Sequence, residues 1–218
     1  VSFFTNSLYL NSFIYSIGIA LITTIICLLL GYPAAYIMAM ADFKTPHVIA
    51  MLFILPMWIN FLLRTIATVE LFRMFGLPLG EGALLFGMVY DFLPFMIYPI
   101  YNTLQKMDTS LIEAAHDLGA KRSQVFMKVT LPLSVPGIYS GIVMVFMPTV
   151  STFAIAELLT HNKVTLFGSL IQRCFGEGGI AMWNYGAALS LIMLVIIFAT
   201  ELFSDGDGDR ASNEGGII

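Results

Sequence analysis

The most evident shortage in this chain is of charged side chains. Only 11% of the 218 residues are Asp, Glu, Lys or Arg, whereas a soluble domain has about 25%. The first 41 residues contain none, hydrophobic residues make up 58% of the chain, and the mean hydropathy is +0.87. These values exclude an ordinary soluble domain and predict an all-α integral membrane protein, because helices satisfy their own backbone hydrogen bonds within lipid.

Motifs for enzymatic chemistry are also missing from the sequence. No Gly is followed by Lys, so there is no G-x-x-x-x-G-K-[ST] loop to hold the phosphates of ATP. His47, His116 and His161 fall in polar stretches without metal-ligand spacing. Cys27 and Cys174 are far apart, which favours packing roles over a disulfide or a metal site. We therefore expect no enzyme activity and no cofactor in this chain, and nothing indicates nucleic-acid binding.

Hydrophobic runs long enough to cross a bilayer need about 20 apolar residues. Polar segments separate these runs and predict loops at 42–47, 70–82, 105–132 and 161–179, the second with a short surface helix. Five spans are predicted, at 13–40, 48–63, 83–104, 133–159 and 180–203, with an extension of the second to Val69 as an alternative. Together they form a transmembrane domain over residues 1–203.

The longest polar stretch within this apolar chain runs from Gln105 to Pro132. Ser110 stands three residues before Glu113, a spacing that predicts a capping box at the start of a short helix. Gly119 predicts its left-handed end, and a second short helix is expected from about Lys121. One face of the first helix is expected to carry Leu111, Ala114, Ala115 and Leu118.

Residue types in this stretch indicate a docking surface. Ala114 and Ala115 allow a partner to approach the backbone closely, and Glu113 and Asp117 point together toward a cation on that partner. The alternative is a solvated helix that only joins two spans.

The pattern Glu113-Ala114-Ala115, then Gly119, then Val129 and Leu131-Pro132 resembles the cytoplasmic motif of ABC importer permeases. The resemblance implies a type I ABC importer permease fold. It also implies that the helix is a coupling helix docking into an ATPase subunit through Glu113, Ala114, Ala115, Asp117, Leu118 and Gly119.

Permeases of this family usually have six spans, so we expect one N-terminal span to be missing from this sequence. The segment 204–218 is rich in Asp and Gly and predicts a disordered tail.

Two acids fall within predicted spans. Asp91 lies in the middle of the third span, where a charge costs roughly 3 kcal/mol or more, and Glu157 lies near the outer end of the fourth. No Lys or Arg is expected near a span centre to pair with them, since Arg64 closes the second span. We therefore predict that both acids line a path for a cation, the alternative being hydrogen bonds to neighbouring helices.

A second resemblance concerns the branch of the family. Leu30–Tyr36, Leu55–Arg64, Val89–Met96 and His116–Ala120 look like the first permease subunit of spermidine/putrescine importers. This resemblance implies polyamine as the substrate, and Trp58 and Tyr90 are expected to contact its ammonium groups by cation–π interaction.

The resemblance further implies a complex in the bacterial cytoplasmic membrane. Its partners would be an ATPase dimer that binds ATP and Mg, a second homologous permease and an extracytoplasmic binding protein. The alternatives are another small solute (iron, sulfate, thiamine or phosphonate) or a secondary transporter that needs no ATPase.

Overall fold

The computed structural model describes residues 7–40, 53, 55–161, 163–176, 182–195 and 197–198. Helices and turns make up this part of the chain, which contains no strand, so the all-α prediction is confirmed. The predicted turn at 42–47, the first part of the second span and the tail at 204–218 lie outside the described residues.

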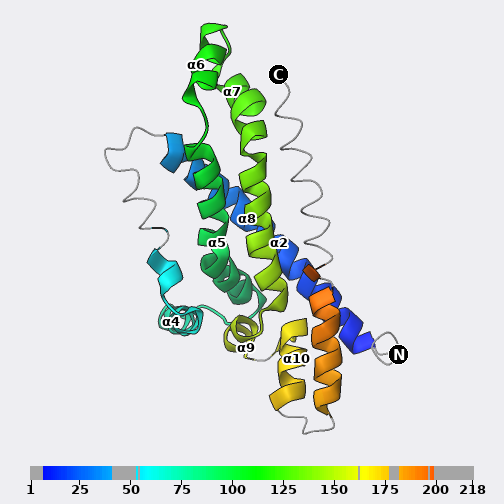
Figure 1. The fold of residues 1–218 in the computed structure, drawn as a ribbon. Helices are drawn as coiled ribbons and strands as arrows, with labels where there is room; N and C mark the ends of the chain where they lie inside the picture. Colours follow the sequence, from blue (N-terminus) through cyan, green and yellow to red (C-terminus); the bar gives the residue numbers. More distant parts are fainter. Residues whose placement is uncertain are drawn as a thin grey trace. The chain divides into compact units, whose positions relative to one another are not determined.

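The chain contains both long and short helices (Figure 1). The long ones are α2 (Ser7–Met40), α4 (Phe61–Met74), α5 (Glu81–Gln105) and α8 (Leu131–Ser151). The short ones are η1 (Leu55–Trp58), α6 (Thr109–Asp117), α7 (Arg122–Val125), the π-helix η2 (Phe126–Thr130), α9 (Ala154–Thr160) and α10 (Phe167–Gly176). A further apolar helix covers Met182–Val195.

Among the described residues, three helices are long and apolar enough to cross a membrane. They are Asn11–Met40, Glu81–Gln105 and Arg122–Ser151. The first and third predicted spans are thereby confirmed. Met182–Val195 lies within the fifth predicted span, and the rest of that span is only partly described.

The fourth span differs from the prediction at both ends. It begins at Arg122 and stops at Ser151, and Phe153 then takes a non-helical conformation before α9 starts. Helix α10 packs directly against this break, because a Cβ on Gly168 would collide with the carbonyl oxygens of Ser151 and Thr152. The glycine brings α10 against the backbone at the point where the helix ends.

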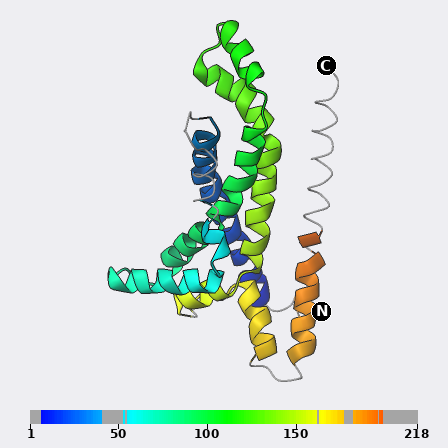
Figure 2. The same cartoon turned by 60° about the vertical axis from the view of Figure 1, so that its left-hand side comes forward.

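The segment 161–179 was predicted to be a polar loop, and that prediction is wrong for its central part. Phe167, Leu170, Ile171 and Cys174 recur at helical spacing, and they place one face of α10 in a core. Figures 1 and 2 show α10 side by side with Met182–Val195.

Arg64 does not close a span, contrary to prediction. The Oδ1 atom of Asn60 accepts a hydrogen bond of 2.9 Å from the N–H of Leu62 and caps α4 at its start. The helix then continues through Arg64 to Met74, so the predicted surface loop at 70–82 begins within α4.

The chain forms two compact units. Unit 1 contains 1–25, 59–92 and 146–218, and unit 2 contains 26–58 and 93–145. In unit 1 one core joins α4, the start of α5 and α9, and the other joins α2, α10 and Met182–Val195.

Unit 2 is packed through glycines. A Cβ on Gly31 of α2 would lie 3.0 Å from the side chain of Met96, and one on Gly141 of α8 would lie 2.7 Å from its sulfur. A Cβ on Gly137 would lie 2.9 Å from the carbonyl oxygen of Pro99. Glycine therefore lets α2 and α8 approach α5 closely within this unit.

Candidate coupling surface and membrane acids

Helix α6 has its N-cap at Asp108, which corrects the predicted capping box of Ser110 and Glu113. The Oδ1 atom of Asp108 accepts a hydrogen bond of 2.9 Å from the backbone N–H of Ser110. This bond lowers the pKa of the Asp108 carboxyl below its ordinary value. Because the cap stands two residues earlier, Ser110 lies within the first turn, and its side chain is not in the N-cap position.

The other end of α6 confirms the prediction for Gly119. Its φ of 79° is in the left-handed region, its N–H donates to the carbonyl of His116 at 2.8 Å, and the N–H of Ala120 donates to that of Ala115 at 3.1 Å. These two bonds form a Schellman motif. The end of α6 is thus fixed by its own backbone, without help from a partner.

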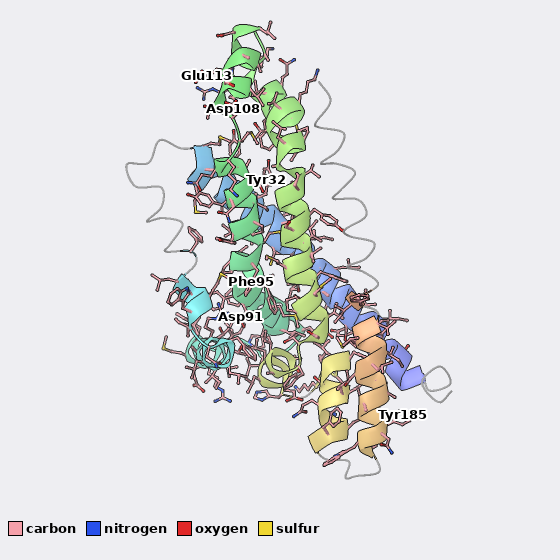
Figure 3. All side chains as sticks on the ribbon, viewed as in Figure 1. Tyr32, Asp91, Phe95, Asp108, Glu113 and Tyr185 are labelled. Carbon is pink, nitrogen blue, oxygen red and sulfur yellow. The ribbon has the colours of Figure 1, made fainter. Side chains whose placement is uncertain are left out.

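No residue of α6 is buried. Leu118, just past the helix, is 89% exposed and Leu111 is 48% exposed, and Glu113, Ala114 and Asp117 are also exposed. Figure 3 shows Glu113 on this segment together with Asp108. An apolar face left uncovered beside two acids is typical of a surface that another protein covers.

A cleft of about 340 Å³ lies between the C-terminal end of α6 and the next two helices. It combines an apolar lining with Lys128 and Gln124. The lining residues are Ala115, Leu118, Gly119, Ala120, Gln124, Val125, Lys128 and Val129. Three of the predicted coupling residues, Ala115, Leu118 and Gly119, therefore share one concave site.

The predicted second helix is confirmed as α7, which starts after Lys121. The N–H of Lys121 donates a hydrogen bond of 2.9 Å to Oε1 of Gln124. From Arg122 the chain remains helical to Ser151, passing through the π-helix η2. Pro132 falls in the first turn of α8, so no loop separates α7 from this span.

The buried acid Asp91 has a cationic partner, contrary to prediction. Nε of Arg64 lies 3.2 Å from Oδ1 of Asp91, and the two side chains are only 6% and 3% exposed. The hydroxyl of Thr65 donates a hydrogen bond of 3.2 Å to Oδ2 of Asp91. The negative charge in the middle of α5 is thus compensated within unit 1. That Asp91 lines a substrate path stays a prediction.

Sequence reasoning missed this pair because it placed Arg64 at the end of a span. The guanidinium carbon of Arg64 also lies 6.0 Å from the ring centroid of Tyr90, which is within reach of a cation–π interaction. Tyr90 therefore contacts a cation of its own chain. Trp58 is 85% exposed and belongs to unit 2.

Glu157 does not stand at the end of the fourth span, because that span has already stopped at Ser151. It lies in the first turn of the separate helix α9 and is half-buried beside buried Ala156. In the described part of the chain, no group of three or more His, Cys, Asp or Glu is arranged to hold a metal ion.

Known proteins resemble this chain in sequence and in fold. Residues 31–205 match the family described as binding-protein-dependent transport system inner membrane component. The spermidine/putrescine transport system permease protein PotB of Escherichia coli is 34% identical, over 87% of this chain and 74% of that protein. PotB of Haemophilus influenzae is 36% identical over 88% of this chain and 72% of that protein. PotC of Shigella flexneri is 27% identical over 94% of this chain and 76% of that protein.

Among solved structures, an inward-facing MetNI methionine ABC transporter matches 93% of this chain and 95% of that chain. The TM-score is 0.75 at 17% sequence identity, and this likeness establishes the type I ABC importer permease fold. The family match covers most of the chain, and the apolar helices agree with it. This chain therefore belongs to the binding-protein-dependent transport system inner membrane components, and it is a multi-pass ABC permease of the cytoplasmic membrane.

Proposed function

We propose that this chain is one of two permease subunits of an ATP-driven polyamine importer. The observation that carries the polyamine assignment is the similarity to spermidine/putrescine permeases, which extends over 87% of the chain. The relatives with 34% and 36% identity are named PotB and the one with 27% identity is named PotC, which supports the first of the two permease types and a PotC-like second subunit as partner.

The ATPase partner docks on α6 and its cleft. Support comes from the fact that no residue of the helix is buried and from a C-terminal end that is already satisfied by backbone hydrogen bonds. Leu118 enters an apolar pocket of the ATPase, while Glu113 and Asp117 face cationic side chains of the same subunit. ATP and Mg are bound by the partner, because this chain has no phosphate-binding loop.

The transport cycle follows from ATP binding by the partner and from its docking on this permease. ATP binding closes the two ATPase subunits and moves the coupling helix that rests on each permease. The path between the permeases then switches between outward-facing and inward-facing states, and a binding protein outside the membrane delivers the polyamine.

Within unit 1, Glu157 is the better candidate than Asp91 for contact with substrate. Asp91 is almost wholly buried and its charge is balanced by Arg64, whereas Glu157 is half-buried, and no salt bridge involves it within the described residues. A carboxylate without a partner attracts an ammonium group more strongly than a neutralised one. Trp58 and Tyr90 stay predicted contacts of the substrate by cation–π interaction, and the Tyr90 ring already faces the guanidinium of Arg64.

The test of this function is ATP hydrolysis by the complete complex in liposomes, measured with binding protein that is empty or loaded with spermidine or putrescine. Stimulation by either loaded form is expected. A complex that hydrolyses ATP without any response to polyamine would show that the substrate is another solute. Failure to capture an ATPase would overturn the assignment to an ATP-driven importer.

Two variants test the docking surface. Ala115→Arg fills the cleft and Gly119→Asp strains a left-handed position by about 1 kcal/mol, so both are expected to abolish uptake while the complex still reaches the membrane. The matched control is Gln105→Arg, which adds the same cation at an exposed position outside the cleft. Normal uptake by Ala115→Arg would remove the cleft from the docking site.

A further inference from the structure

The π-helix η2 stands between the coupling segment and α8. Its defining bond runs from the N–H of Leu131 to the carbonyl of Phe126, so one residue more than in an α-helix is held in this turn. Helix α6 packs against both α7 and η2 within unit 2. A displacement of α6 by a partner would therefore act directly on α7 and η2.

Phe126, the first residue of η2, is held between two tyrosines of α2. Its ring centroid is 5.9 Å from that of Tyr32 and 5.4 Å from that of Tyr36, with interplanar angles of 80° and 89°. Both are edge-to-face contacts, the arrangement that aromatic pairs favour. The two tyrosines lie one helical turn apart, so they contact the same ring from adjacent turns of α2.

A chain of hydrogen bonds ties the same two helices together. The hydroxyl of Ser134 donates to the carbonyl of Leu131 at 2.8 Å, and the Tyr32 hydroxyl lies 3.0 Å from the Ser134 oxygen. Since Ser134 has one hydroxyl hydrogen and Leu131 takes it, Tyr32 is the donor in the longer bond. Ser134 is fully buried. Figure 3 labels Tyr32 where α2 passes α8.

The hydrogen bonds of η2 and of Ser134 meet at Leu131. Leu131 accepts from Ser134 through its carbonyl and donates to Phe126 through its N–H. The π-turn is thus joined to α2 in two ways. The ring of Phe126 contacts Tyr32 and Tyr36, and hydrogen bonds connect Tyr32 through Ser134 to Leu131. A short distance away, Gly31 and Gly141 close α2 and α8 onto Met96 of α5. Close packing of this kind transmits displacement because it deforms little.

We propose that Phe126, Tyr32 and Ser134 form a joint that transmits movement of the coupling helix into α2. They are positioning residues for transport, and none needs to touch the substrate. The proposal rests on the proposed function in one respect, namely that an ATPase moves α6. Loss of the joint would leave ATP hydrolysis running while less substrate crosses the membrane for each ATP.

The first test measures a distance and needs no substrate. Spin labels are placed at Ser123→Cys on α7 and Ile37→Cys on α2, both exposed, in a chain whose two buried cysteines are replaced with alanine. The distance distribution in the complete complex is expected to be narrow, and equal with and without bound ATP analogue. Phe126→Ala should broaden it, and Phe126→Tyr should restore it because the ring is kept.

The second test measures polyamine uptake per ATP hydrolysed in liposomes. Phe126→Ala is expected to lower this ratio about five-fold or more, the usual scale of a coupling loss. Tyr32→Phe keeps the ring and removes the hydroxyl, so a loss of about two-fold or more is expected. The matched control is Leu133→Ala, a half-exposed neighbour of Ser134, which should change neither the ratio nor the distance.

The outcomes separate this proposal from the proposed function. If the unaltered complex showed no response to polyamine, the polyamine assignment would be wrong. The distance measurement would still test whether Phe126, Tyr32 and Ser134 form the joint. A Phe126→Ala protein with an unchanged narrow distribution would overturn the joint, even where polyamine uptake per ATP is lowered.

Discussion

The buried ion pair of Arg64 and Asp91 gives the sharpest prediction for the stability of this chain. Replacing Asp91 with Leu leaves the Arg64 guanidinium buried without a counter-charge, and replacing Arg64 with Met leaves the carboxylate in the same position. Breaking a buried pair from one side costs about 3–5 kcal/mol. Each single variant is therefore expected to lose that much free energy of unfolding.

The magnitude follows from the geometry of the pair. With an effective dielectric constant of about 20, opposite charges 3.2 Å apart attract by about 5 kcal/mol. Removing each ion from water costs several kcal/mol, so the pair as a whole adds little net stability. The double variant Arg64→Met with Asp91→Leu is expected to unfold within about 1 kcal/mol of the original chain.

The assay is reversible unfolding of the four proteins in detergent with increasing denaturant. A matched control is Glu70→Gln, which breaks the ion pair with Arg73 on the same helix. That pair is 3.0 Å long but its side chains are 55% and 63% exposed, so its loss should cost less than about 1 kcal/mol.

Two results would refute this reasoning. If the single variants unfolded like the original chain, the two charges would not be buried as a pair. If the double variant unfolded as easily as the single variants, the cost of each single change would not come from leaving its partner buried and unpaired.

Three further predictions concern other parts of the chain. At pH values above the ordinary pKa of a carboxyl group, the Asp108 cap stabilises α6, and this stabilisation is lost as the pH falls through the lowered pKa of Asp108. Asp108→Ala should speed hydrogen exchange at the N–H of Ser110 at neutral pH, and Asp108→Asn should not. Gly137→Ala should destabilise the chain by about 1–3 kcal/mol in thermal unfolding because α5 must move, whereas Gly18→Ala, with open space around it, should not. Glu157→Gln should lower polyamine uptake more than assembly, and unchanged uptake would remove Glu157 from the path.

Local signals explain why the segment from α6 to α7 was largely predictable. Gly119 takes the left-handed conformation that a helix end needs, and the second helix starts where its polar residues indicated. The N-cap was misplaced because Asp108 and Ser110 are both good caps. The choice between them depends on where the span of α5 ends.

By itself, the sequence determined the helical membrane class, two of the spans and the place of the short helix α6, because hydropathy and turn residues act over a few positions. Only the tertiary structure decided which side chains meet. Arg64 neutralises Asp91 once α4 lies on α5, and Tyr32 reaches Ser134 across 102 positions of sequence. Such pairs depend on how helices pack, which no local pattern specifies.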